Sequence, residues 1–438
     1  MVSDDVAAAR GRERDDLFRW VVLVGVGTLA TWWAVRSGAG LGTASAPFLG
    51  RYRVEIGPGS VLAPLIAMAV LVCAQRGWFH TARWPLLVIV SYCGLLLWSA
   101  ALAFVDGADG FTRALLSPES YLNDVTAVGD HPGEYLRTFT ATAAEKSFAT
   151  RGHPPAPVLL LWAAEKAGIT NHLLLGLAVT ALGALVAPLV LSTVRDVCGE
   201  AAARSYAPLL ILATWAVWLA VSMDALVATL GAAAIAAGVR ATSKHRWKAG
   251  GWALSAGVLL GFAALFSYAA AWLGLSLVCL NFARRRAALN WAAGFGALIP
   301  VLLAWAAGFN WFDGLLSAHN DFTARVDPVR PALPWAGISL VALLLAAGPA
   351  LVTGVRKMRN TPAWAFLAGA GAAVLFSILA GLARGGVEHA WLPFFPWLTI
   401  AAVAPEERGG PIPPAPIVLT AAGAITAIIV EAVLATTT

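Results

Sequence analysis

The sequence has few charged residues. Asp, Glu, Lys and Arg make up 12% of its 438 residues, about half of the roughly 25% that is usual in soluble domains. A chain with so little charge cannot cover its folded surface with groups that favour water, which excludes an ordinary soluble protein. Its outer surface must contact lipid, where only helices or closed barrels satisfy their own backbone polar groups.

Cysteine is also scarce, and its four copies are scattered. They lie in or beside apolar stretches, without the C-x-x-C spacing of metal and redox motifs, at Cys73, Cys93, Cys198 and Cys279. This pattern predicts buried thiols and neither a disulfide framework nor a cysteine metal site. The sequence also lacks the strong internal repeat that marks many transporters with duplicated halves.

Long apolar runs are abundant. Hydrophobic residues make up 59% of the chain, its mean hydropathy is +0.74, and the runs are continuous, which favours membrane helices over a barrel. We predict an all-α polytopic membrane protein with about 13 transmembrane helices. Their expected positions are 18–36, 60–75, 84–105, 173–194, 205–222, 225–240, 249–267, 269–282, 290–308, 335–354, 363–382, 394–404 and 415–434.

The net charge of +6 does not indicate nucleic-acid binding, because the basic residues fall in short loops between apolar spans. With a cytoplasmic N-terminus, alternate loops hold an excess of Lys and Arg, as the positive-inside rule requires. The first apolar run is too long for a signal peptide and has no small-residue cleavage site, so we expect it to be retained. The sequence thus predicts a multi-pass protein of the plasma membrane.

This orientation divides the chain into four parts. A cytoplasmic segment, 1–17, precedes the first three spans, 18–105, and a large extracytoplasmic loop, 106–172, precedes the remaining spans, 173–438. The apolar stretch 154–167 within the large loop is too short to cross a membrane and predicts an interfacial or re-entrant helix. Two further polar loops, 309–335 and 384–396, are expected on the same outer face.

The loop 106–172 supplies the candidates for a catalytic base. It carries eight carboxylates, most of which are expected to be solvated surface charges. Asp130 is the preferred candidate, because Gly129, Pro132 and Gly133 surround it with a tight turn that could hold its carboxylate rigidly. Asp106 and Glu119 follow. A carboxylate within hydrogen-bond reach can activate an attacking hydroxyl group.

Other polar residues gather where the outer loops meet the spans. Arg151 and His153 suit a phosphate, although the prolines beside them could simply start a helix, and Arg384 is a third cation. Asp224, between two apolar runs, is either functional or a helix cap. The remaining substrate-binding candidates lie among aromatic residues that could equally form an interfacial belt, and they are Glu388, His389, Trp391, Trp311, Asp313 and Tyr268.

These stretches together resemble a known family, the GT-C superfamily of integral membrane glycosyltransferases. Within it the chain is similar to the actinobacterial group that resembles methylthioxylose transferase. The resemblance follows the family's order from residue 105 onward, and it rests on the segments 105–122, 128–130, 151–155, 222–226, 266–268, 308–314, 386–388 and 391–394. Each segment alone is weak evidence for the family, and only their combination is specific for its fold and superfamily.

The resemblance implies a GT-C-like fold and transfer of a sugar from a polyprenyl-phosphate donor to an envelope glycan or glycolipid outside the cytoplasm. Family members build arabinogalactan and lipoarabinomannan. Arg151, His153 and Arg384 would bind the donor phosphate, and in-line displacement with Asp130 as base would invert the anomeric centre. Most relatives need no metal, but the carboxylates of the loop 106–172 could bind a divalent ion, so a metal requirement is left as an alternative.

The chain departs from the family at two positions. Ala156 stands where Gly usually follows the two prolines, and His389 stands where Arg usually follows the Glu. The second change replaces a permanent bidentate cation, and so alters how a phosphate or acceptor could be held. The main alternative function is a transporter or flippase of lipid-linked sugar, which should place its charges near the bilayer midplane on broken helices. A scaffold without activity is a third alternative.

Overall fold

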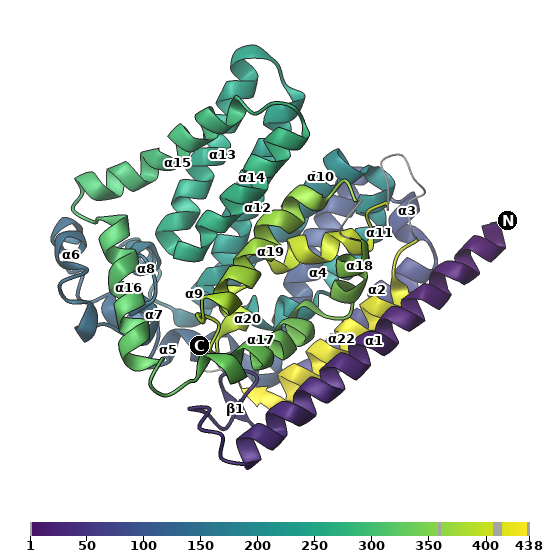
Figure 1. Ribbon diagram of the computed structural model, residues 1–438, viewed down its shortest axis with the longest axis horizontal. Coiled ribbons are helices and arrows are strands. Elements are labelled where there is room, and N and C mark those ends of the chain that lie inside the picture. The colour runs from purple at the N-terminus through teal and green to yellow at the C-terminus, as the bar shows by residue number, and fades with distance from the viewer. Residues whose placement is uncertain (1, 358–360, 406–413, 436–438) are drawn as a thin grey trace.

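The protein is built almost entirely of helices. The computed structural model describes residues 2–357, 361–405 and 414–435. The α-helices (Figure 1) are α1 (Val2–Arg36), α2 (Gly59–Gln75), α3 (Trp78–Thr81), α4 (Trp84–Ala103), α5 (Arg113–Leu116), α6 (Pro132–Thr138), α7 (Phe148–Arg151), α8 (Ala156–Lys166), α9 (His172–Ala184), α10 (Val186–Cys198), α11 (Glu200–Ile211), α12 (Met223–Ser243), α13 (Arg246–Phe266), α14 (Leu273–Ala283), α15 (Leu289–Ala306), α16 (Trp311–Arg325), α17 (Ala332–Ala347), α18 (Ala350–Lys357), α19 (Trp364–Leu379), α20 (Val387–Ala390), α21 (Phe395–Thr399) and α22 (Ile417–Val433).

Short 3₁₀ helices and one small sheet complete the fold. The 3₁₀ helices are η1 (Phe104–Phe111), η2 (Tyr121–Asp124), η3 (Ala143–Glu145), η4 (Thr214–Trp218), η5 (Tyr268–Trp272) and η6 (Ile400–Ala402). Strands β1 (Arg51–Tyr52) and β2 (Leu434–Ala435) pair antiparallel, with Arg51 opposite Ala435. The all-α prediction is confirmed, and the strand pair joins the segment between α1 and α2 to the end of α22.

Several helices are long and apolar enough to cross a membrane. Six stretches qualify in the described part of the chain: Gly11–Arg36, Trp84–Leu116, His172–Cys198, Met223–Ser243, Arg246–Phe266 and Leu289–Ala306. A seventh, α17 with α18, is bent by 105°. The chain is therefore a multi-pass membrane protein in composition and helix length. The predicted count of thirteen spans is not confirmed.

Two predicted spans are broken in the structure. Within 205–222 the chain forms α11, which contains Pro208, and then η4. Within 394–404 it forms only α21, with Pro396 in its first turn, and η6. Proline lacks the N–H that continues a helical ladder. Both segments are apolar because they are buried in the protein interior, where Trp215 and Trp397 are 2% and 0% exposed.

Side chains complete the hydrogen bonding of these broken segments. The Trp98 indole and the Ser99 hydroxyl donate to the carbonyl oxygens of Ala213 and Ala216, at 3.1 and 2.9 Å. The Tyr206 hydroxyl donates to the Pro396 carbonyl oxygen at 2.6 Å. Irregular backbone within a membrane protein is tolerated where neighbouring groups satisfy it in this way.

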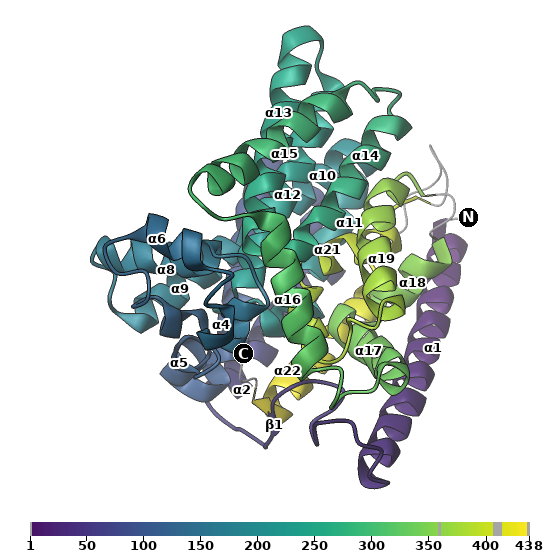
Figure 2. The same cartoon turned by 60° about the vertical axis from the view of Figure 1, so that its left-hand side comes forward.

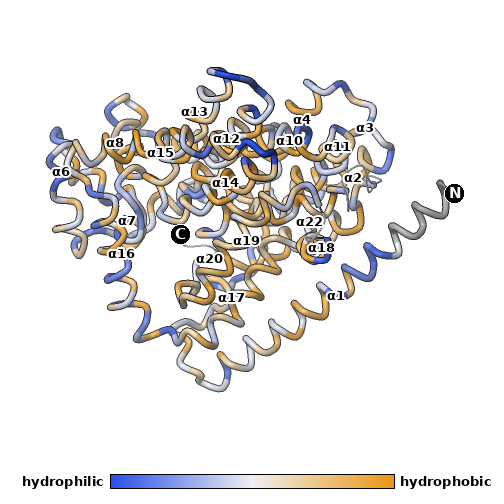
Figure 3. Tube along the Cα trace, turned by 45° about the horizontal axis from the view of Figure 1, so that its top comes forward, coloured by the Kyte–Doolittle hydropathy of each residue, from blue (hydrophilic) through white to orange (hydrophobic). Residues whose placement is uncertain are grey.

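Helix α1 lies along the outside of the bundle, against α17, α18 and α22 (Figure 1). In Figure 3 the coloured part of α1 begins with a hydrophilic stretch and is mostly apolar beyond it. Buried Asp16 pairs with Arg356 at 2.9 Å and accepts from the Thr353 hydroxyl at 2.8 Å. The Trp20 indole donates to the Leu344 carbonyl oxygen at 2.8 Å. These contacts fix α1 to helices from the other end of the sequence.

The loop 106–172 forms a compact layer of short helices beside the bundle (Figure 2). It holds η1, α5, η2, α6, η3, α7 and α8, around a small apolar core that includes Val128, Tyr135, Phe139 and Val158. Helix α8 has 11 residues, too few to cross a bilayer. Its predicted interfacial position stays a prediction.

Candidate active site

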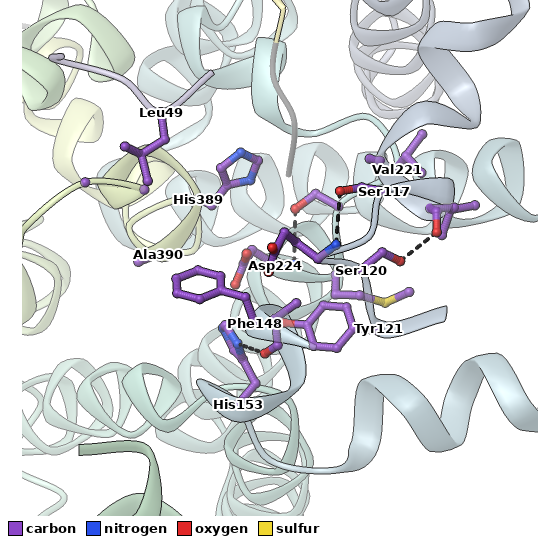
Figure 4. A pocket seen from close by; sticks show the side chains of 18 residues that line it. Leu49, Ser117, Ser120, Tyr121, Phe148, His153, Val221, Asp224, His389 and Ala390 are labelled. Carbon is purple, nitrogen blue, oxygen red and sulfur yellow. Dashed lines mark hydrogen bonds between the residues drawn. The ribbon is translucent and has the colours of Figure 1, made fainter. Parts of the chain in front are cut away.

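A cavity of about 190 Å³ lies where the large loop, the start of α12 and α20 meet. A single water needs roughly 10–15 Å³ of such volume, so the cavity has room for a small ligand. Figure 4 shows the side chains around it. The lining residues are Leu49, Ala114, Leu115, Ser117, Glu119, Ser120, Tyr121, Phe148, Ala149, His153, Val221, Ser222, Met223, Asp224, Gly385, Gly386, His389 and Ala390.

Asp224 projects into this cavity from the first turn of α12 (Figure 4). The helix cap is the preceding Ser222, whose hydroxyl oxygen accepts from the Asp224 N–H at 3.2 Å. The Asp224 carboxylate has no hydrogen-bond or ion-pair partner among the described residues. Ser222 thus takes the capping role that the sequence left open for Asp224, and the carboxylate remains available to a ligand.

His153 lines the cavity from the turn after α7. Its Nδ1 lies 2.8 Å from the Ala149 carbonyl oxygen, which can only accept, so this nitrogen carries a hydrogen. The opposite nitrogen, Nε2, is then left to exchange a proton with a ligand. The ring of Tyr121 packs edge-on against His153 at 5.6 Å. Burial and the nearby Asp224 carboxylate raise the pKa of Tyr121, which therefore stays protonated.

His389 closes the cavity from α20. Burial, with a smaller contribution from the His153 charge, lowers its pKa from 6.5 to about 4. The imidazole is therefore neutral at pH 7. Its Nε2 is buried and has no hydrogen-bond partner within the described structure. Buried polar atoms are rarely left unpaired, so this nitrogen is expected to bind a ligand atom or water in the cavity.

Glu388 lies directly behind the cavity wall. It is 1% exposed; one carboxylate oxygen accepts from the Leu49 N–H at 3.3 Å, and the other has no described partner. Burial raises its pKa from 4.5 to about 7. Between these two values the folded chain holds a proton that the unfolded chain has released, so the contribution of Glu388 to stability falls as pH rises.

Comparisons with protein-family models, curated proteins and solved structures found no significant match. The site is therefore interpreted from its own geometry.

Of the predicted catalytic residues, only Glu119 lines the cavity, at an exposed position on its rim. The Asp130 side chain is 81% exposed and pairs with Lys166 at 2.6 Å, an interaction that lowers its pKa. Asp106 pairs with Arg113 and, at 3.4 Å, with Arg53. The structure thus places Asp130 and Asp106 in ion pairs outside the cavity, and their catalytic roles stay predictions.

Of the predicted phosphate ligands, His153 lines the cavity and the two arginines do not. Arg151 pairs with Asp321 of α16 at 3.3 Å. Arg384 pairs with Asp327 at 2.7 Å and donates to the Arg330 carbonyl oxygen at 2.9 Å. These pairs fasten the large loop and the segment before α20 to the loop 309–335.

Some of the predicted substrate-binding residues line the cavity and others do not. Asp224 and His389 are in the cavity, and Glu388 is behind it. The Trp391 indole donates to the Ser377 hydroxyl at 3.0 Å and the Trp311 indole to the Ala264 carbonyl oxygen at 2.8 Å. Tyr268 packs edge-on against Trp311, and Asp313 is exposed on α16. Trp391, Trp311, Tyr268 and Asp313 are not among the cavity-lining residues.

Leu49 and Tyr121 line the cavity but were not predicted as parts of the site. Tyr121 is one of only six tyrosines in the chain and lies within a segment that carried the family resemblance, which was a usable signal. No feature of the sequence indicated Leu49, because its hydrogen bond to Glu388 joins residues far apart in the chain. No group of three or more His, Cys, Asp or Glu residues in the described ranges is placed to hold a metal ion.

Proposed function

We propose that this chain is a membrane glycosyltransferase of the GT-C type, with about thirteen membrane segments. It transfers a sugar from a polyprenyl-phosphate donor to a cell-envelope glycan or glycolipid on the extracytoplasmic face of the plasma membrane. The observation that carries the proposal is the convergence of the Asp224 carboxylate, His153 and His389 on one cavity at the start of α12.

The position of the cavity supports chemistry at an interface. Helix α12 has 21 residues and, at about 1.5 Å per residue, is roughly 30 Å long, close to the thickness of the hydrocarbon core. Asp224 begins this helix, and Lys244, Arg246 and Lys248 follow its other end. If the basic end is cytoplasmic, the cavity opens at the outer boundary, where a lipid-linked donor presents its sugar.

The side chains suit transfer to a hydroxyl group. Asp224 would accept the proton of the acceptor hydroxyl as its oxygen attacks the anomeric carbon, and the phosphate would leave from the opposite side, which inverts that carbon. His153 would contact the departing phosphate through Nε2, because its Nδ1 is held by the Ala149 carbonyl oxygen. His389, neutral and unpaired at Nε2, would orient a sugar hydroxyl. The donor carries its own leaving group, so no cofactor is required by this scheme.

A transporter or flippase of lipid-linked sugar is the competing proposal. Such a protein needs a substrate site near the bilayer midplane. The cavity beside Thr214 and Gly423 has a volume of about 10 Å³, whereas the cavity that holds Asp224, His153 and His389 has about 190 Å³ and lies at the start of α12. This contrast favours chemistry over transport.

The test is turnover by purified protein in detergent, supplied with radiolabelled polyprenyl-phosphate sugars and a lipid extract as acceptor source. Transfer of label to a new glycolipid or glycan is expected, since detergent abolishes transport but leaves chemistry intact. Absence of transfer across a panel of donor sugars, together with movement of lipid-linked sugar across the bilayer of reconstituted vesicles, would establish the transporter instead.

A further inference from the structure

A second polar cavity lies at the opposite end of α12. It has a volume of about 510 Å³, and four helices or their ends form its walls: α10, α12, α13 and α14. The lining residues are Asp196, Val239, Arg240, Thr242, Ser243, Lys244, Trp252 and Arg284. We call this cavity the basic cleft. It shares no residue with the candidate active site.

The basic cleft carries uncompensated positive charge. Arg240, Lys244 and Arg284 face a single acidic residue, Asp196, and none of the three cations forms an ion pair in the described part of the chain. The Arg284 guanidinium reaches only the Asp196 carbonyl oxygen, at 3.5 Å. An anion with several acceptor oxygens would satisfy this arrangement, and a phosphate group is such an anion.

Its walls are held in place by the protein itself. The Arg240 guanidinium lies over the Trp252 ring at 5.2 Å, and the Arg286 guanidinium donates to the Lys244 carbonyl oxygen at 2.9 Å. The hydroxyl groups of Thr242 and Ser243 donate to carbonyl oxygens one turn back in α12. The Arg240 side chain and the Lys244 backbone are therefore held without a neighbouring carboxylate.

Apolar surface adjoins the basic cleft. Trp252 also lines a neighbouring cavity of about 410 Å³ with Trp247, whose side chain is 78% exposed. On α14, Val278 and Phe282 are exposed one turn apart, just before Arg284. Exposed tryptophan beside basic residues is typical of the headgroup region of a bilayer. An anion bound here would have hydrocarbon chains within reach of an apolar surface, as in a phospholipid.

We propose that the basic cleft binds the phosphate-bearing headgroup of an anionic membrane lipid, in the leaflet opposite the candidate active site. Basic pockets between membrane helices bind such headgroups elsewhere. Because the bound lipid would contact four helices at once, it is expected to stabilise the packing of α10, α12, α13 and α14. The proposal does not depend on the proposed glycosyltransferase activity.

The test uses the full chain, purified in a neutral detergent and titrated with phosphatidylglycerol or phosphatidylcholine in mixed micelles. The apparent melting temperature and lipid retention in native mass spectrometry are measured. Phosphatidylglycerol should raise the melting temperature and be retained, and phosphatidylcholine should do neither. In the double variant Arg240→Gln/Lys244→Gln the apparent affinity for phosphatidylglycerol should fall roughly tenfold or more, and Arg284→Gln alone should weaken it less.

The matched control is Arg76→Gln/Arg83→Gln, which removes the same charge from exposed positions between α2 and α4. This variant should keep the wild-type response. Equal losses in the two double variants would mean general attraction of anionic lipid to a basic surface, and would overturn the proposal. An equal stabilisation by inorganic phosphate alone, again lost with Arg240 and Lys244, would show a site for free anions and overturn the lipid assignment.

Discussion

Replacement of Asp224 by asparagine is the most informative perturbation of the candidate site. Asparagine has nearly the same shape, so the packing at the start of α12 is preserved, and the Ser222 cap does not involve the carboxylate. What the substitution removes is the ability to accept a proton. If Asp224 is the catalytic base, the rate of sugar transfer should fall by roughly 10²–10⁴-fold, which corresponds to about 3–5 kcal/mol of lost transition-state stabilisation.

The same experiment on Asp130 tests the prediction made from sequence. A catalytic Asp130 would make Asp130→Asn inactive without affecting folding. The geometry favours the opposite result, because the Asp130 side chain is 81% exposed, pairs with Lys166 and does not line the cavity. We therefore expect Asp130→Asn to retain wild-type transfer.

The assay is transfer of radiolabel from a polyprenyl-phosphate sugar by detergent-purified protein, with folding checked by size-exclusion profile. Asp109→Asn is the matched control, since Asp109 is an exposed carboxylate of the same loop that does not line the cavity. Full activity in Asp224→Asn would refute the assignment of the base. Loss of activity in folded Asp130→Asn, with Asp224→Asn active, would restore the assignment from sequence.

Three further outcomes are expected. In detergent, the apparent melting temperature of Glu388→Gln should rise relative to that of the wild type as pH increases from 5 to 7.5. The wild-type carboxyl has a pKa of about 7, so its contribution to the free energy of unfolding falls by at most roughly 3 kcal/mol over that range. A difference in melting temperature that stays constant with pH would contradict the burial of an ionisable group. Gly257→Ala should lower the melting temperature, since its Cβ would overlap the backbone of α15, whereas Gly250→Ala on the same helix meets open space and should not; equal effects would argue against this close helix contact. In a cysteine-free background in cells, a membrane-impermeant thiol reagent should label Ala127→Cys and not Ser243→Cys, and the reverse pattern would refute the proposed orientation.

Composition alone was enough to predict the all-helical, multi-pass character of the chain, because a low charge content and long apolar runs leave few other stable forms. Hydropathy could not separate helices that face lipid from segments buried in protein. The runs 205–222 and 394–404 are as apolar as a span, yet η4, α21 and η6 are short and fully covered by other helices. Trp215 and Trp397 make these runs apolar because they are buried in the protein interior, and their presence does not indicate a helix long enough to cross the membrane.

The candidate site was only partly accessible from sequence. Asp224 was predicted because an ionisable residue between apolar runs is costly, and His389 because it stands with Glu388 beside a group of aromatic residues; both line the cavity. Asp130 was preferred for its turn of glycine and proline, which predicts a rigid backbone and says nothing of which way the carboxylate points. Arg151 and Arg384 looked available for a phosphate because their partners, Asp321 and Asp327, lie in a different loop.

The position of α1 has a consequence for how this protein is made. Helix α1 is synthesised well before α17, α18 and α22, the helices against which it packs. Until they arrive, its buried Asp16 has neither Arg356 nor Thr353 beside it. Helix α1 therefore lacks these partners until α17, α18 and α22 have been synthesised, and its packing into the bundle follows their insertion.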